Sequence, residues 1–208
     1  VTCNAASSAC AKGQEWSSAL FLLWSMAEVR VTPDVITFTA AISSCKGIAQ
    51  WQSVLRMLGV AIAWKISPDI IMCNAAIGAC ENGGHWIEAM RLLWRTVAWR
   101  VAPTVSTCNA AISSCDKAGK WQLALNLLCR MEGWHVLPDV LTISIAISAC
   151  EKSAQWQEAL EVLRRAAHLR ISPNVVTCSG AVGACDKGGR WLEVLYWLWR
   201  SGPTASRV

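Results

Sequence analysis

The sequence has few of the residues and runs that mark disordered, membrane-spanning or metal-binding proteins. Only 16% of its 208 residues are charged and 54% are hydrophobic, a balance that excludes a disordered chain. No apolar run reaches the length of about 18 residues that a membrane span needs; the longest, 57–64, lies between Arg56 and Lys65. Tyr occurs once, and the three His form no ligand-spaced cluster with the cysteines. We therefore expect no membrane contact, no zinc or other metal site and no cofactor.

The residues that are abundant recur with a period of 35. Tryptophan, cysteine and proline are in phase without insertion or deletion, at Trp16, Trp51, Trp86, Trp121, Trp156 and Trp191, at Cys10, Cys45, Cys80, Cys115, Cys150 and Cys185, and at Pro33, Pro68, Pro103, Pro138 and Pro173. This spacing divides the chain into repeats 1–34, 35–69, 70–104, 105–139, 140–174 and 175–208. The chain opens inside a repeat, so we expect a single repeat array, 1–208, that is a fragment of a longer protein.

Each repeat is predicted to form two helices. In 70–104, apolar residues at Cys73, Ala76, Ile77 and Cys80 follow the spacing of an amphipathic helix, and the spacing resumes at Trp86 after two glycines. One helical hairpin cannot bury both apolar stripes, whereas stacked hairpins can. The sequence therefore predicts an all-α solenoid, with the position-17 tryptophans in its core and the cysteines as small buried hydrophobic residues in a reducing compartment.

The first helix of each repeat has a second, polar face. We number each repeat from the residue after its Pro-Asp pair, so that positions 2, 5, 9 and 13 share this face. Position 2 is mostly aliphatic, position 5 is Asn, Thr or Ser, position 9 is Ser or Gly, and position 13 is often Lys. Such a set suits single-stranded RNA, because it can pack a base, read a base edge and meet a phosphate.

The 35-residue period resembles the pentatricopeptide repeat (PPR) family in its plain, P-type form. The supporting phrases are 175–179 (VVTCS), 159–163 (ALEVL) and 67–69 (SPD). The resemblance implies a right-handed α-solenoid without catalytic residues that binds single-stranded RNA in a mitochondrion or plastid. There it would support RNA processing, stability, editing or translation. In this family positions 5 and 35 read one base per repeat, and position-2 residues sandwich it.

Carried over to this sequence, the resemblance names the residues of an RNA site. The base-reading residues would be Asn4, Asp34, Thr39, Asp69, Asn74, Thr104, Asn109, Asp139, Ser144, Asn174 and Ser179. The base-sandwiching residues would be Val1, Ile36, Ile71, Leu141 and Val176. The phosphate-contacting residues are expected at Lys12, Lys117, Lys152 and Lys187. The family's pairs then predict the target 5′-U-G-Y-U-A-3′.

Other interpretations of the same residues remain open at this stage. Asp at position 35 can serve only as an N-cap, a task for which Thr at position 3 competes. Lys, Arg or His at position 31 is expected to contact the helix C-terminus, and the acids at position 12 to form a solvated edge. Tryptophans at positions 25 and 30, namely Trp24, Trp94, Trp199, Trp64, Trp99 and Trp134, offer an outer surface for a protein partner. The alternative function is a protein-protein scaffold of the tetratricopeptide type, which has a 34-residue period; no recurring carboxylate cluster favours a hydrolase or nuclease.

Overall fold

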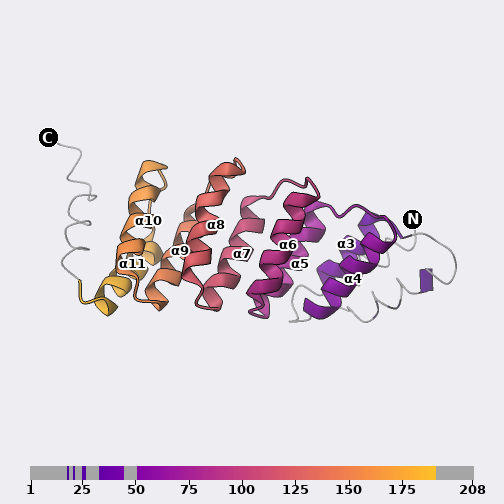
Figure 1. Cartoon of the computed structure of the whole chain (residues 1–208), viewed down its shortest axis with the longest axis horizontal. Coiled ribbons are helices and arrows are strands. Elements are labelled where there is room, and N and C mark those ends of the chain that lie inside the picture. Colours follow the sequence, from indigo (N-terminus) through magenta and orange to yellow (C-terminus); the bar gives the residue numbers. More distant parts are fainter. Residues whose placement is uncertain (1–17, 19–20, 22–24, 27–32, 45–50, 191–208) are drawn as a thin grey trace. The chain divides into compact units, whose positions relative to one another are not determined.

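A computed structural model describes residues 18, 21, 25–26, 33–44 and 51–190, and these residues contain helices and turns but no strand (Figure 1). They belong to two compact units, divided between Ser114 and Cys115. None of the described helices has both the length and the apolar character that a membrane crossing requires. The expected all-α repeat solenoid is confirmed.

The described part of the first unit contains two helical hairpins and the start of a further one. Its helices are α3 (Val35–Ser44), α4 (Trp51–Ala63), α5 (Ile70–Asn82) and α6 (Trp86–Ala98), followed by α7 (Val105–Lys117), which crosses the unit boundary. Helix α5 contacts its own partner α6 and both helices of the preceding hairpin. The first helices α3 and α5 therefore stack directly on one another.

The second unit follows the same pattern. Its helices are α8 (Trp121–Gly133), α9 (Val140–Lys152), α10 (Trp156–His168) and α11 (Val175–Lys187). Helix α9 contacts α8, α10 and α11. Apart from α3, each of these helices has 13 residues, with first helices beginning at position 1 and second helices at position 17 of the repeat.

The stacking depends on small and aliphatic residues at fixed positions of the first helices. Position 7 is alanine throughout and has no exposed surface at Ala41, Ala76, Ala111, Ala146 and Ala181. Its small methyl side chain lets neighbouring first helices approach closely, and larger buried residues such as Ile77 and Ile147 fill the space beside it. The predicted apolar stripe is thus the core of each unit.

The cysteines belong to this core, as the sequence predicts. Cys80, Cys115, Cys150 and Cys185 are fully buried at position 11, and every described cysteine is a free thiol. Burial raises the pKa of Cys80 and Cys150 to about 12, and that of Cys108 and Cys115 to about 11. These thiols are therefore protonated and unreactive at neutral pH.

Both helices of a repeat end on a residue in the left-handed conformation. At the end of the second helix this is position 31, with φ near 60° at Lys65, Arg100, His135 and Arg170. The flanking bonds, such as Arg100 N–H to Val97 O and Val101 N–H to Thr96 O, form the paired C-cap of a Schellman motif. The expected contact between the position-31 charge and the helix C-terminus is therefore only part of the explanation, because the backbone of position 31 itself ends the helix. Ala154, with φ 54°, does the same for a first helix at the position where the third, fourth and sixth repeats have glycine.

The position-17 tryptophans are half-buried, so the prediction that they lie in the core is wrong in part. The described members of this set are Trp51, Trp86, Trp121 and Trp156. The ring of Trp51 lies 4.1 Å from that of His85, and Arg190 stands 5.4 Å over the ring of Trp156. Both partners occupy position 16 of the next repeat. These indoles therefore join the turn of one repeat to the second helix of the repeat before it.

Candidate nucleic-acid interface

The aliphatic residues at position 2 are exposed on the first turn of each first helix. Ile36, Ile71, Leu141 and Val176 keep 57 to 62% of their surface accessible, in contrast to the buried stripe on the same helices. Ser106 is exposed at the equivalent place in α7, and Val1 lies outside the described residues. A repeated exposed aliphatic side chain has no use in the core and offers an apolar contact to a ligand.

The position-35 residues act as N-caps. Asp69 Oδ1 accepts from the Met72 backbone N–H at 2.7 Å, and Asn174 Oδ1 accepts from that of Thr177 at 2.9 Å. Asp139 forms a capping box with Thr142, whose backbone N–H and hydroxyl each lie 2.8 Å from Oδ1. Position-3 threonines therefore cooperate with the cap instead of competing for it.

Capping does not use up a carboxylate. An ionised carboxylate has two oxygens and room for about four hydrogen bonds, and the capping bond at Asp69 involves Oδ1. Asp at position 35 is therefore an N-cap, as one interpretation of the sequence proposes. Capping is compatible with a second role for the same side chain.

The position-5 hydroxyls are held by their own helices. Thr39 donates to Val35 O at 2.7 Å, Ser144 to Val140 O at 2.8 Å, and Ser179 to Val176 O at 3.0 Å. With its proton used in this way, each hydroxyl oxygen is an acceptor toward any ligand. Asn109 is 7% exposed, the most buried of the set, and Asn4 lies outside the described residues.

Asn74 bonds directly to the following repeat. Its Nδ2 donates to the Thr104 hydroxyl at 3.4 Å, and its Oδ1 accepts from the hydroxyl of Thr107. The structure thus brings together positions 5 and 35 of this repeat, as expected of a base-reading pair. It adds Thr107 at position 3 of the next repeat, for which the sequence predicted only a capping role.

Three of the four position-12 acids, Glu81, Asp116 and Glu151, do not form the expected solvated edge, whereas the fourth, Asp186, is exposed as expected. Asp116 is 8% exposed, and its Oδ2 lies 2.6 Å from Lys152 Nζ. Glu151 Oε1 lies 3.1 Å from Lys187 Nζ, and Glu81 Oε1 accepts from Ser113 at 2.8 Å. Glu81, Asp116 and Glu151 therefore each bridge to the first helix of the following repeat. The recurrence of an acid and a lysine 36 residues apart is the sequence feature that could have revealed these bridges.

Two of the expected phosphate-contacting lysines are thus paired within the protein. Lys152 and Lys187 keep 50% and 49% of their side-chain surface accessible. An ammonium group has three donors, so one bond to a carboxylate leaves capacity for an external anion. Lys117 is exposed on α7, and Lys12 lies outside the described residues.

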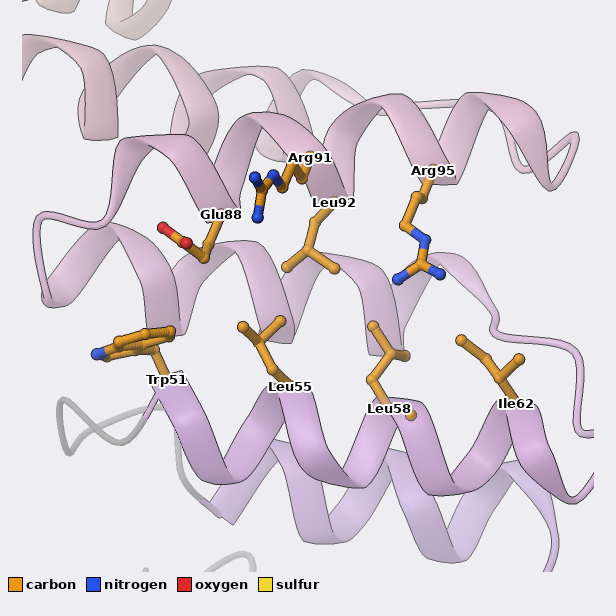
Figure 2. A pocket seen from close by; sticks show the side chains of 9 residues that line it. Trp51, Leu55, Leu58, Ile62, Glu88, Arg91, Leu92 and Arg95 are labelled. Atoms are coloured by element: carbon orange, nitrogen blue, oxygen red, sulfur yellow. The ribbon is translucent and has the colours of Figure 1, made fainter.

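A separate cleft lies on the second helices of the first unit. Figure 2 shows side chains of α4 and α6 pointing toward one another across it. Its volume is about 250 Å³, and its lining is Trp51, Leu55, Leu58, Gly59, Ile62, Glu88, Arg91, Leu92 and Arg95. None of these residues belongs to the predicted RNA face. Within the described part of the chain, no group of three or more His, Cys, Asp or Glu is arranged to hold a metal ion.

The outer tryptophans are only partly accessible. Trp64 and Trp94 are 41% and 38% exposed, while Trp99 and Trp134 are half-buried. The ring of Trp64 packs edge-on against Phe38 at 5.9 Å, and Arg95 stands 5.7 Å over the ring of Trp99. Trp24 and Trp199 lie outside the described residues. Packing within the protein accounts for much of the tryptophan surface.

Comparison with known proteins connects this geometry to one repeat family. Residues 103–152 match the model of the PPR repeat family. No curated protein sequence matches the chain. The solved structure of PPR10 from maize is similar, with a TM-score of 0.69 and 24% identity, over 97% of this chain and 29% of its own. PPR10 bound to an 18-nt psaJ RNA element gives a TM-score of 0.67 and 24% identity, over 96% and 28%.

A second protein shares the fold at lower identity. The PPR domain of Arabidopsis thaliana protein-only RNase P 1, solved in complex with tRNA, has a TM-score of 0.72 and 13% identity. The match covers 88% of this chain and 93% of that domain. Likeness at these identities shows the fold, and the chain spans less than a third of the length of PPR10.

Proposed function

We propose that the chain is a pentatricopeptide repeat protein, as the family match over residues 103–152 and the shared fold support, and that it binds single-stranded RNA, one base per repeat. The observation that carries the proposal is the exposed aliphatic residue at position 2 beside the polar residues at positions 5 and 35, repeated on successive first helices. PPR10 and the RNase P 1 PPR domain, which share the fold, have each been solved with RNA.

Each set has the chemistry that a base requires. The side chain at position 2 can cover a base face, as Ile36 and Ile71 would on either side of one base. At the second repeat, Thr39 supplies an oxygen acceptor and Asp69 a carboxylate, and both favour a base with N–H donors on its reading edge, such as guanine. The predicted order along the chain is 5′-U-G-Y-U-A-3′.

Lys117, Lys152 and Lys187 would then contact phosphates on the same face. Such contacts add affinity without adding base preference. For Lys152 and Lys187 the phosphate would share the ammonium group with Asp116 and Glu151, which hold the lysines on the first-helix surface.

We propose no catalytic role for the described residues. The function would be to occupy an RNA segment and thereby support its processing, stability, editing or translation, in a mitochondrion or plastid. These roles are proposed for the repeats of this chain, which span 29% of the length of PPR10.

Filter binding with short RNAs tests the proposal. RNAs that contain U-G-C-U-A or U-G-U-U-A should bind at least about tenfold more tightly than scrambled RNAs of the same composition, a difference that two well-placed base contacts supply. Equal affinity for all sequences at low salt would refute base reading. Absence of RNA binding altogether would favour the alternative, a protein scaffold, for which the cleft between α4 and α6 is the natural site.

A further inference from the structure

The third repeat has a different residue at position 35 from the other repeats in which this position is described. Its position-35 residue is Thr104, where the described neighbours have Asp or Asn. The Thr104 hydroxyl lies 3.4 Å from Asn74 Nδ2 and 2.9 Å from the Thr107 hydroxyl, which in turn contacts Asn74 Oδ1. The three side chains therefore form a closed ring of hydrogen bonds, and Thr107, fully buried, comes from the next repeat.

The direction of each bond in this ring follows from the number of protons available. The Thr107 hydroxyl donates to Asn74 Oδ1, and a hydroxyl has a single proton to donate. The Thr107 proton goes to Asn74, and the Thr104 proton must therefore go to Thr107.

This arrangement saturates Thr104. Its oxygen accepts from Asn74 Nδ2 and from the Thr107 backbone N–H at 3.3 Å, and its proton is donated to Thr107. A hydroxyl has one donor and two acceptor sites, so none remains for a base. Asn74 retains one amide N–H and one carbonyl lone pair outside the ring.

We propose that Thr107 is a specificity-determining residue of the third repeat, which holds Asn74 and Thr104 so that uracil and cytosine bind alike. The inference rests on the proposed RNA-binding function. Both pyrimidines have the O2 acceptor that the remaining amide N–H can meet, and they differ at N3, which is a donor in uracil and an acceptor in cytosine. A carboxylate at position 35 would select uracil at that atom, but the saturated Thr104 makes no such selection.

The experiment uses four fluorescein-labelled RNAs that contain U-G-N-U-A with identical flanks, N being each of the four bases. The unmodified chain should bind the U and C forms within about twofold and the A and G forms at least about fivefold more weakly, the worth of one hydrogen bond. Thr107→Val keeps the shape but opens the ring. It frees the amide to turn, so the pyrimidine preference should fall at least about threefold.

Three further variants make the result specific. Thr107→Ser keeps the hydroxyl and should keep the original third-base profile. Thr104→Asp supplies a carboxylate and should favour the U form over the C form by about tenfold or more. Thr177→Val is the matched control: it removes the equivalent threonine behind Ser144, whose hydroxyl bonds to its own helix, and should leave the third-base profile unchanged.

The two hypotheses fail in different ways. If the unmodified chain prefers none of the U-G-N-U-A RNAs to scrambled RNA, the proposed function is wrong and the inference with it. If the chain binds selectively but Thr107→Val, helical by circular dichroism, keeps the original third-base profile, the inference alone is overturned. A tenfold preference between U and C in the unmodified chain would overturn it as well.

Discussion

Replacing Gly188 by alanine should destabilise the second unit, although the backbone at this position suits any residue. A Cβ at Gly188 would overlap Trp156 Cδ1 and lie 3.3 Å from Trp156 Cβ, so rotation of the indole alone cannot relieve the clash. Overpacking of this kind costs about 1 to 3 kcal/mol. The alanine recovers about 0.4 to 1 kcal/mol by restricting the unfolded chain. We expect a net loss of about 1 to 2 kcal/mol.

The matched control is Gly59→Ala in α4. A Cβ at Gly59 would meet nothing within 4 Å, so the same chemical change should stabilise the chain by up to about 1 kcal/mol through helix propensity. Thermal melts followed by circular dichroism should therefore move in opposite directions, by about 2 to 4 °C per kcal/mol.

A double variant identifies the cause. In a Trp156→Ala background the clash is absent, and Gly188→Ala should become neutral or slightly stabilising, with a coupling energy of about 1 kcal/mol or more. An unchanged cost of Gly188→Ala in that background would refute the role assigned to Trp156 as the contact between one repeat and the next turn.

Three other predictions follow from the same contacts. Ala154→Gly should raise the free energy of unfolding by about 0.5 to 1 kcal/mol, measured by urea titration, because Ala154 has φ 54° and glycine tolerates that conformation. Between about pH 9 and pH 12 the free energy of unfolding should fall, since thiols of the unfolded chain ionise near pH 9 while buried thiols such as Cys80 keep their protons until about pH 12. At pH 8 the exposed Cys129 should react with a thiol reagent before Cys80 does, and faster loss of the Cys80 thiol would contradict this assignment. Lys152→Gln should weaken the binding of all RNAs alike and flatten the dependence of log K on log salt concentration by roughly 0.7, whereas Asp116→Asn, which keeps the lysine, should leave that slope unchanged. A change in base preference in Lys152→Gln would show that Lys152 is not a phosphate contact.

The fold was predictable from the sequence because the residues that are buried recur with the 35-residue period of the repeat. The alanines at position 7 and the cysteines at position 11 are spaced so that both face the neighbouring helix, and those that the structure describes are completely buried. The boundaries of the described helices follow from the same phase, with Trp51 and Trp86 each at the start of a second helix. A 35-residue pattern repeated without a gap therefore indicates both which residues are buried and where the helices begin.

The contacts between repeats were harder to predict, because they depend on how one hairpin stacks on the next. The bridge from Asp116 to Lys152 joins side chains 36 residues apart and looks, in sequence, like two solvated charges. The left-handed conformation at Arg100 was hidden for another reason. Glycine marks that conformation in most proteins, and here charged residues occupy it. Thr107 was missed because its role at Asn74 appears only when two repeats are seen together.

The central claim is that position 5, together with position 35, selects the base, and exchanging two position-5 residues tests it most directly. Thr39→Asn should change the second base from G to U, with Asp69 retained, and Asn109→Thr should change the fourth base from U to G, with Asp139 retained. The double variant should therefore prefer U-U-Y-G-A to U-G-Y-U-A in competition binding, reversing the preference of the unmodified chain. A double variant that folds and binds RNA but still prefers U-G-Y-U-A would contradict the claim.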